Sequence, residues 1–384
     1  MRKKSVHFLA AGMVMMLFGI TMVAVGTINN YLTINFRVDK LFIGFCASVL
    51  AAGILIGSFT FGPIAERFGY KPVMLGGVLL VILGITGITF SVRVNLVPFM
   101  FFVMGLGGGS INGVTNMLVA DLYPQNSSAY LSLLGVFYGI GALGFPLLTS
   151  LLLDKAMDYQ TILLIVAIIL LIPFFLVLLL KFPSAKKSKP VSFKGYFKFF
   201  SNPVILSIGL FLFFYGALEA IIPAWTPTYL MEVADISYDK ALYAITAIAI
   251  GITITRLFLS QILKRISPII IIFGSMAVIF LGIIILNYAS SLFMGISSSA
   301  VMGIGIAASF PVMLGFTARA FPYNSGTAFS IVIGISLVGN MLLNSLTGFI
   351  LNQFGIKQLI LILITFIILM LVILSFLKHR HFKN

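Results

Sequence analysis

The stretch MGLGGGSINGVTNMLVADLYPQNSSAY, from Met104 to Tyr130, returns in altered form as MGIGIAASFPVMLGFTARAFPYNSGTAF, from Met302 to Phe329. A shift of 198 positions places each Met-Gly pair and each Asn-Ser pair on its counterpart. Each copy reads as a long apolar helix, a short polar turn containing proline, and a second apolar helix. Two apolar halves that repeat in this way are typical of a transporter built by duplication.

The composition is that of a membrane protein. The chain has 384 residues, of which 60% are hydrophobic and 9% charged, and its mean hydropathy is +1.17. A soluble domain of this length could not cover its surface with so few charges, whereas a lipid-facing protein can. The sequence therefore predicts an all-α membrane protein. Because further apolar runs follow at once, the basic start Arg2-Lys3-Lys4 is interpreted as opening an uncleaved first helix.

Residues suited to catalysis or metal binding are scarce. The lone Cys46 excludes an internal disulfide, and the three histidines stand near the termini without a cluster of cysteines or carboxylates. The glycine-rich Gly105–Gly109 lies inside an apolar run, so helix packing explains it better than phosphate binding does. We therefore expect no enzyme activity, no cofactor and no metal.

Apolar runs long enough to cross a bilayer divide the chain into two sets of six. They are expected near residues 8–34, 41–65, 72–91, 95–121, 129–152, 160–181, 203–230, 240–262, 268–287, 292–318, 326–351 and 357–377. The domain prediction is a six-helix half at 1–181, a linker at 182–201 and a second six-helix half at 202–384. The linker alternates lysine with aromatic residues, so it reads either as an amphipathic helix on the anionic inner leaflet or as a solvated connection.

The positive charge follows the expected topology. The net charge is +15, and placing both termini in the cytoplasm puts seventeen Lys and Arg residues inside and six outside. This asymmetry satisfies the positive-inside rule. We therefore expect a multi-pass protein of the cytoplasmic membrane with both termini cytoplasmic, and we interpret the basic balance as topology, which excludes nucleic acid as a partner.

The fourth run combines small residues with buried amides. Gly105, Gly109 and Gly113 recur every four residues, which lets a neighbouring helix approach closely. Asn112 and Asn116 share one helix face, and amides facing lipid would be costly. We expect Asn112 to line a cavity and Asn116 to join helices.

The seventh run carries the residues of greatest chemical interest. Tyr215 and Glu219 lie one helical turn apart, and Glu219 is the only carboxylate well inside a predicted span. It could carry a proton, accept a substrate hydroxyl, or pair structurally with a neighbouring hydroxyl or arginine. Trp225, the only tryptophan, could stack on a sugar ring or anchor the helix at the membrane interface. Prolines at 223 and 227 predict a break or kink just beyond.

Polar side chains recur at helical spacing elsewhere. In the eleventh run these are Ser336, Asn340, Asn344 and Thr347, and in the first run Asn29 and Thr33 with Asn30 beside them. Polar stripes in both halves suit a hydroxylated solute near the membrane midplane. Arg256 in the eighth run is interpreted as snorkelling to the interface in preference to binding an anion.

A short charged segment separates the second and third runs. Its residues are Gly62, Glu66, Arg67, Gly69 and Lys71, which suit a tight cytoplasmic hairpin whose charges pair across helix ends. It resembles the loop motif of the major facilitator superfamily, G-x-x-x-D-R-x-G-R-K, with Glu66 in place of Asp and Tyr70 in place of a basic residue. The resemblance implies that this loop governs conformational exchange and does not bind substrate.

A wider resemblance runs along nearly the whole chain. The glycine-rich fourth run, FYGIGALGFP at residues 137–146, the Tyr-Gly-x-x-Glu…Trp pattern ending at Trp225 and GIAASFP at residues 305–311 are similar to the fucose–galactose–glucose:proton symporter branch of that superfamily. This implies the twelve-helix major facilitator fold in two pseudo-symmetric halves, alternating access and monosaccharide uptake. Glu219 matches the branch's span-seven motif. Asn112 stands where members commonly carry Glu, and Asn30 where fucose-type members carry Asp.

The sequence thus predicts a monomeric secondary transporter of a monosaccharide or similar small polar solute, driven by protons, by another ion, or by the solute gradient alone. The predicted substrate site comprises Asn30, Asn112, Tyr215, Glu219, Trp225, Asn340 and Asn344, with Glu219 as the candidate for proton coupling. The alternative function is export of drugs or other small amphipathic compounds, which the high phenylalanine content permits. A receptor without transport activity would be expected to carry large extramembrane domains or a long tail.

Overall fold

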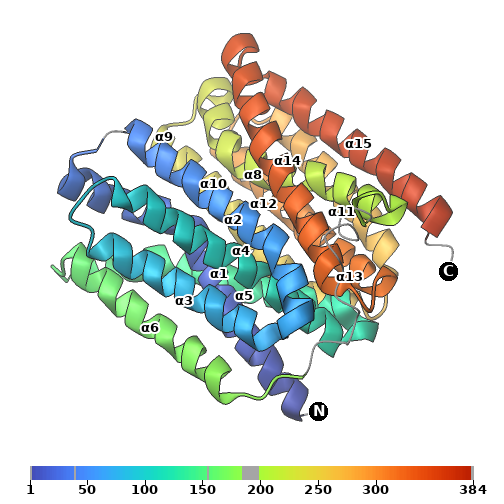
Figure 1. Ribbon diagram of the computed structural model, residues 1–384. Coiled ribbons are helices and arrows are strands. Elements are labelled where there is room, and N and C mark those ends of the chain that lie inside the picture. The colour runs from blue at the N-terminus through green and yellow to red at the C-terminus, as the bar shows by residue number, and fades with distance from the viewer. Residues whose placement is uncertain (1, 39, 154, 184–198, 382–384) are drawn as a thin grey trace. The chain divides into compact units, whose positions relative to one another are not determined.

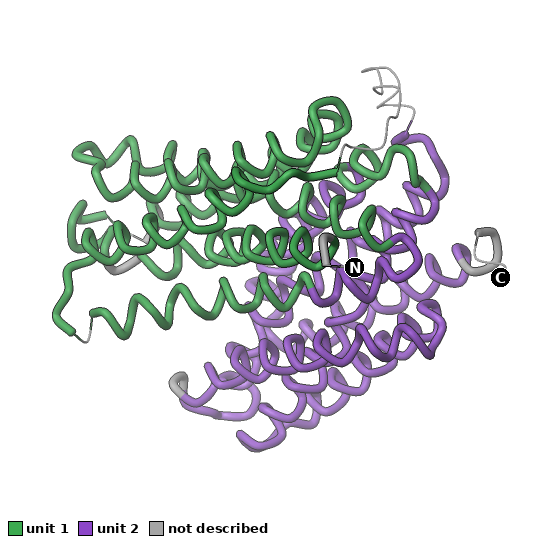
Figure 2. Tube along the Cα trace, turned by 90° about the horizontal axis from the view of Figure 1, so that it is seen from below, with its two compact units in different colours: residues 1–123, 134–196, 321–330 green, residues 124–133, 197–320, 331–384 purple. Residues whose placement is uncertain are grey.

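The computed structural model is all-helical and describes every residue except 1, 39, 154, 184–198 and 382–384 (Figure 1). Most of the predicted linker therefore lies outside the described residues, and both interpretations of it, the amphipathic helix and the solvated connection, stay predictions. The described chain separates into two compact units (Figure 2). Unit 1 comprises residues 1–123, 134–196 and 321–330, and unit 2 comprises residues 124–133, 197–320 and 331–384.

The helices of the first half of the chain are long and mostly apolar. They are α1 (Arg2–Phe36), α2 (Lys40–Phe68), α3 (Tyr70–Thr89), α4 (Leu96–Leu122), α5 (Ser127–Leu153) and α6 (Tyr159–Leu179), with a short 3₁₀ turn at Pro124–Asn126. Within unit 1, α4 packs against α1, α2 and α3, and α6 packs against α3. The first residues of α5 belong to unit 2 and its remainder to unit 1.

The described part of the second half also contains six membrane-spanning segments, but a short helix, α9, precedes the second of them and the fourth is divided into α12 and α13. Its helices are α8 (Pro203–Ala234), α9 (Tyr238–Ala241), α10 (Tyr243–Ile262), α11 (Pro268–Asn287), α12 (Leu292–Ile306), α13 (Ser309–Ala320), α14 (Ser325–Phe354) and α15 (Gln358–His381). Within unit 2, α12 packs against α10 and α11, and α15 packs against α8 and α11. The start of α14, up to residue 330, belongs to unit 1.

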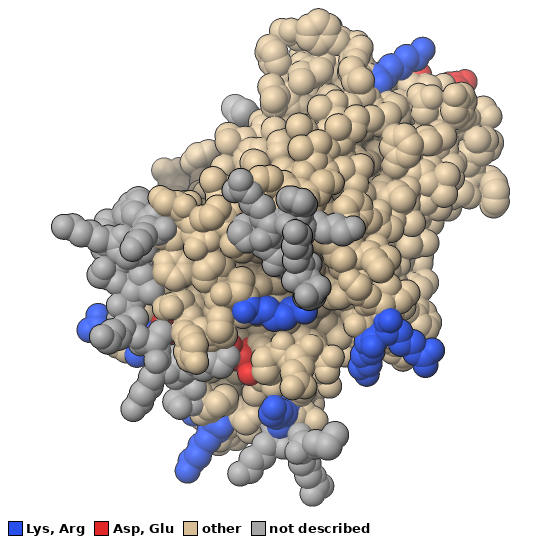
Figure 3. Space-filling model, turned by 90° about the vertical axis from the view of Figure 1, so that its right-hand side faces the viewer, with Lys and Arg blue, Asp and Glu red and all other residues tan. Residues whose placement is uncertain are grey.

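Twelve segments of the described chain are long and apolar enough to cross a membrane, which confirms the predicted number. At 1.5 Å per residue, about 20 residues span the hydrocarbon core, and each segment has at least 20. On the face shown in Figure 3, most of the surface carries no charged side chain. Lys and Arg gather mainly in the lower part of that view, as expected where charges leave the hydrocarbon for the headgroup region.

Glycine allows the closest helix crossings of both units. A β-carbon on Gly105 of α4 would overlap the backbone oxygen of Leu50 in α2, and one on Gly303 of α12 would overlap the backbone oxygen of Ile248 in α10. Without a driving force from water, helices in lipid associate through such tight van der Waals packing. The glycines singled out in the sequence are therefore packing residues.

Three features of the structure differ from the sequence prediction: one span, one pair of prolines and one hairpin. The span predicted at 292–318 consists of two helices, because Pro311 cannot donate to the carbonyl of Ala307 and the helix is interrupted at residues 307–308. By contrast, α8 continues through Pro223 and Pro227, so of the predicted break or kink the break is wrong and the kink stays a prediction. Prolines are tolerated inside membrane helices when neighbouring groups satisfy the freed carbonyls.

The hairpin predicted around residues 62–71 is almost entirely helical. Helix α2 continues through Glu66 and Arg67 to Phe68, and α3 begins at Tyr70, so Gly69 alone makes the turn. Its φ of +89° lies in the region that only glycine adopts at little cost, and its amide donates to the carbonyl of Ala65 at 2.8 Å.

Asp158 caps the N-terminus of α6. Its carboxylate accepts hydrogen bonds from the hydroxyl of Thr161 at 2.7 Å and from the backbone amide of Thr161 at 3.0 Å. These bonds lower the pKa of Asp158 below its ordinary value of 3.8.

We expect Asp158→Ala to lower the thermal unfolding midpoint in detergent near neutral pH. A group whose pKa is lowered by folding stabilises above its unfolded value and loses that contribution as pH falls through the folded value. The difference between wild type and Asp158→Ala should therefore shrink well below pH 3.8. Asp158→Asn keeps an uncharged acceptor and should differ from Asp158→Ala by an amount independent of pH. A constant difference between wild type and Asp158→Ala at all pH values would contradict the cap.

Candidate functional site

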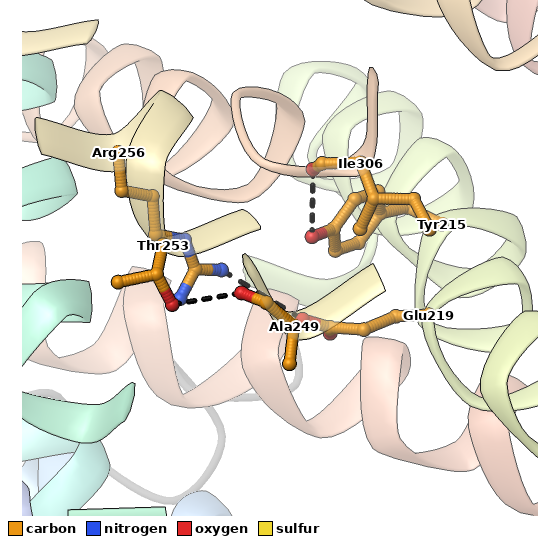
Figure 4. Close-up of polar contacts among 6 residues, drawn as sticks. All are labelled: Tyr215, Glu219, Ala249, Thr253, Arg256 and Ile306. Carbon is orange, nitrogen blue, oxygen red and sulfur yellow. Dashed lines mark hydrogen bonds and ion pairs between the residues drawn. The ribbon is translucent and has the colours of Figure 1, made fainter. Parts of the chain in front are cut away.

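An ion pair lies inside unit 2, between α8 and α10. The Nη2 of Arg256 is 3.7 Å from Oε1 of Glu219 (Figure 4). The Arg256 side chain is 8% exposed and the Glu219 side chain is 39% exposed. The snorkelling interpretation of Arg256 is therefore wrong, because its side chain is buried and pairs with the carboxylate of Glu219 inside unit 2. Of the alternatives for Glu219, the pairing with an arginine is observed.

The backbone of Arg256 is held from a second side. The hydroxyl of Ser132, near the start of α5, donates to the carbonyl oxygen of Arg256 at 2.9 Å. Ser132 belongs to the part of α5 that lies in unit 2. Because both the backbone and the guanidinium of Arg256 have defined partners, its position relative to Glu219 is well constrained.

Tyr215 lies one turn before Glu219 and is fully buried. Its hydroxyl donates to the carbonyl of Ile306 at 3.1 Å, at the point where α12 ends (Figure 4). Helix interruption leaves carbonyls such as this one without an intrahelical partner, and the tyrosine supplies one. The Tyr215 hydroxyl thus contacts the interrupted helix, and its predicted contact with substrate stays a prediction.

Trp225 and Asn344, two residues of the predicted site, contact each other within unit 2. The indole Nε1 of Trp225 donates to Oδ1 of Asn344 at 3.2 Å. Gly348, one turn further along α14, leaves the space that the indole ring occupies, since its β-carbon would lie 3.2 Å from that ring. Asn340, one turn earlier, is half-buried. The ring of Trp225 thus lies beside the side-chain amide of Asn344.

In unit 1 the two predicted asparagines contact each other. The amide of Asn116 donates to the carbonyl oxygen of Asn112 at 2.7 Å and to its side-chain oxygen at 3.0 Å. Asn112 is 4% exposed and Asn116 is 3% exposed. The amides thus form a local pair on α4. The side chain of Asn30 lies outside the described residues, so its predicted place in the site stays a prediction.

The residues of the α2–α3 motif hold the start of α14 within unit 1. Both carboxylate oxygens of Glu66 accept from Thr327, one from its backbone amide at 2.7 Å and one from its hydroxyl at 2.8 Å. An anion at a helix N-terminus also interacts favourably with the helix dipole. The sequence predicts that the charges of this motif pair across neighbouring helix ends. The structure shows instead that Glu66 bonds to the start of α14.

Other members of the motif bind different elements. Tyr70, in the place of a basic residue, donates to Asp121 at 2.6 Å, and Asp121 also accepts from Ser325 at 3.3 Å. Lys71 donates to the carbonyls of Leu178 at 2.6 Å and Leu180 at 3.1 Å, at the C-terminus of α6. Arg67 lies over the ring of its neighbour Phe68, 5.1 Å from the centroid.

Sequence reasoning missed Ser132, Ser325 and Thr327. Ser325 is the serine of the second Pro-x-Asn-Ser turn, and Ser132 and Thr327 follow these turns in the first two turns of α5 and α14. The repeated Asn-Ser pair was a usable signal, because serine and threonine at helix starts can bond to neighbouring backbone groups. Among the residues that the structure describes, no group of three His, Cys, Asp or Glu side chains could hold a metal ion.

Comparison with known proteins identifies a family model that matches this chain. A family model described as Major Facilitator Superfamily matches residues 8–299. The inner membrane transport protein YdiN of Escherichia coli (strain K12) is 24% identical over 382 residues, covering 96% of this chain and 88% of that protein. A TsgA homolog of Buchnera aphidicola (subsp. Baizongia pistaciae) is 23% identical over 366 residues, covering 93% of this chain and 90% of that protein.

A solved structure supports the same fold. The E. coli fucose:proton symporter FucP superimposes with a TM-score of 0.82, covering 97% of this chain and 99% of that chain. The sequence identity is 17%, so this likeness concerns the fold. The match confirms the predicted twelve-helix architecture.

Proposed function

Because this chain belongs to the Major Facilitator Superfamily, a family of secondary transporters and not of enzymes, we propose that it carries a monosaccharide of hexose-like size across the cytoplasmic membrane by alternating access. The protein is a multi-pass integral membrane protein that moves a small solute. We further propose that it works as a monomer, that both termini are cytoplasmic, and that the solute gradient or a coupled ion such as the proton provides the driving force.

The contact between Trp225 and Asn344 is the observation that most favours a sugar. An aromatic ring combines an apolar face with a polar edge, which suits the alternating C–H and O–H surfaces of a sugar ring. The indole N–H donates to the side-chain oxygen of Asn344, and the amide nitrogen of the same side chain is a donor that suits a sugar hydroxyl. Glu219 lies six residues earlier, about 9 Å of helix rise away, and adds a partly exposed acceptor.

Counterflow in proteoliposomes tests this proposal. Purified protein is loaded with unlabelled hexoses, pentoses or amino sugars, and entry of the radiolabelled sugar is followed with and without an imposed pH gradient. Saturable counterflow of one sugar supports the proposal, and accumulation that follows the gradient adds proton coupling. Absence of counterflow across the whole panel would reject the sugar assignment and favour export of amphipathic compounds, which a dye-efflux assay on the same vesicles would detect.

We expect Trp225→Leu to raise the KM for the transported sugar about tenfold while the protein remains folded. The substitution removes the aromatic face and the donor to Asn344, and stacking of one aromatic on a ligand ring contributes on the order of 1 kcal/mol. Trp225→Phe keeps a ring and should lie between wild type and Trp225→Leu. Phe349, an exposed aromatic on α14, is the matched control, and Phe349→Leu should leave KM unchanged. Equal KM values for wild type and Trp225→Leu would remove Trp225 from the site.

A further inference from the structure

The Glu219–Arg256 pair has one accessible end. The carboxylate side chain is 39% exposed, whereas the guanidinium side chain is 8% exposed. A charged carboxylate open to hydrocarbon would be costly, so the exposed part of Glu219 is expected to face water or a solute. A solute that reaches this pair therefore meets a hydrogen-bond acceptor before it meets the positive charge.

The pair also favours a negative charge on that acceptor. An arginine side chain stays protonated in proteins, and an opposite charge nearby favours the ionised carboxylate. On the described elements packed around α8, the titratable or charged groups that interact with Glu219 are Arg256 and the hydroxyl of Tyr215. Since Ser132 fixes the Arg256 backbone, the compensating charge stays in place beside Glu219.

We propose that Arg256 is the positioning residue that sets the specificity of the site. It holds Glu219 as a permanently ionised hydrogen-bond acceptor, so the site selects neutral polyhydroxylated solutes. Glu219 then carries no proton during transport. This inference rests on the proposed sugar transport and deepens it. An anionic solute would meet the carboxylate first and be repelled. A cationic solute would add a second positive charge beside Arg256, whereas hydroxyl groups donate to Glu219 without changing the charge of the site.

A double-mutant cycle in proteoliposomes tests the inference. Counterflow is measured from about pH 5 to about pH 8, a range in which a desolvated, unpaired glutamate can titrate. Wild type should show a flat pH profile. Arg256→Gln leaves Glu219 without its compensating charge, so counterflow should become pH-dependent, changing about tenfold over the range. Arg256→Gln combined with Glu219→Gln should be flat again, and Arg256→Lys should restore the flat profile. The matched control Arg319→Gln removes a partly exposed arginine of the same unit and should keep the profile of wild type.

Substrate selection gives a second readout. Among a hexose, its amino sugar and its uronic acid, wild type should transport the hexose best and reject the uronic acid. A uronic acid transported as well as the parent hexose would overturn the inference, because it would place the positive charge at the accessible end of the pair.

The protonation state of Glu219 can be followed without transport. The infrared band of protonated carboxyl groups, compared between wild type and Glu219→Gln, should show no pH-dependent contribution from Glu219 in wild type. In Arg256→Gln, compared with the variant that carries both substitutions, the same band should show a pH-dependent contribution from Glu219. A Glu219 band that titrates in wild type would overturn the inference even if no sugar were transported. A flat counterflow profile in Arg256→Gln would also overturn it, whereas a wild type that transports no sugar would reject the proposed function.

Discussion

Replacing Gly105 or Gly303 with leucine is expected to destabilise the protein by about 3 kcal/mol or more, the upper range for overpacking a close-packed site. The β-carbon alone would overlap the backbone oxygen of Leu50 in the first case and of Ile248 in the second. Backbone atoms cannot rotate away as a flexible side chain can, so the helices must separate along their crossing. A lower thermal unfolding midpoint and loss of monodisperse protein in detergent would measure this effect.

The chain supplies a matched control. Gly76 and Gly274 also lie within helices, α3 and α11, and nothing stands within 4 Å of a β-carbon built on either one. Gly76→Leu and Gly274→Leu add the same atoms and the same helix propensity, so they should have little effect or stabilise slightly. If all four variants had equal unfolding midpoints, the close crossings would contribute nothing measurable to stability.

These crossings explain why the duplication was readable in the sequence. A shift of 198 positions maps Gly105 onto Gly303 and Leu50 onto Ile248, and the carbonyl contact is the same in both units. A crossing at backbone distance tolerates only glycine, so the glycines remain recognisable in both copies although their neighbours differ. Helix number and order were predictable for the related reason that each apolar run must span the same thickness of hydrocarbon.

The polar contacts were less predictable, because they depend on residues far apart in sequence. Glu219 and Arg256 were both identified as unusual intramembrane charges, but one sequence contains no signal that α10 turns Arg256 towards α8. The interruption after Ile306 had a visible cause in Pro311, whereas Pro223 and Pro227 offered the same signal and α8 continues. Tertiary packing decides which proline interrupts a membrane helix, and local sequence alone does not.

Glu66→Ala is expected to release the segment 321–330 from unit 1. The carboxylate makes two hydrogen bonds to Thr327, one of them to the backbone amide at the start of α14. Hydrogen bonds to a charged group contribute about 1.5–3 kcal/mol each, so a loss of about 3 kcal/mol corresponds to a change of about 100-fold in the local opening equilibrium. Hydrogen–deuterium exchange of the amides from Ser325 to Ser330, read by mass spectrometry in detergent, should accelerate by about this factor.

Lys71→Gln separates this contact from a general weakening of the α2–α3 motif. Lys71 belongs to the same motif but bonds to the carbonyls of Leu178 and Leu180 at the end of α6, so its loss should leave exchange at Thr327 unchanged. Glu66→Gln retains one acceptor oxygen without the charge and should give an intermediate rate. If the loop governs conformational exchange, as the motif implies, the sugar counterflow rate should change with Glu66→Ala in proportion to amide exchange. Unaltered exchange in Glu66→Ala would show that Asp121, through Ser325, holds α14 sufficiently without Glu66.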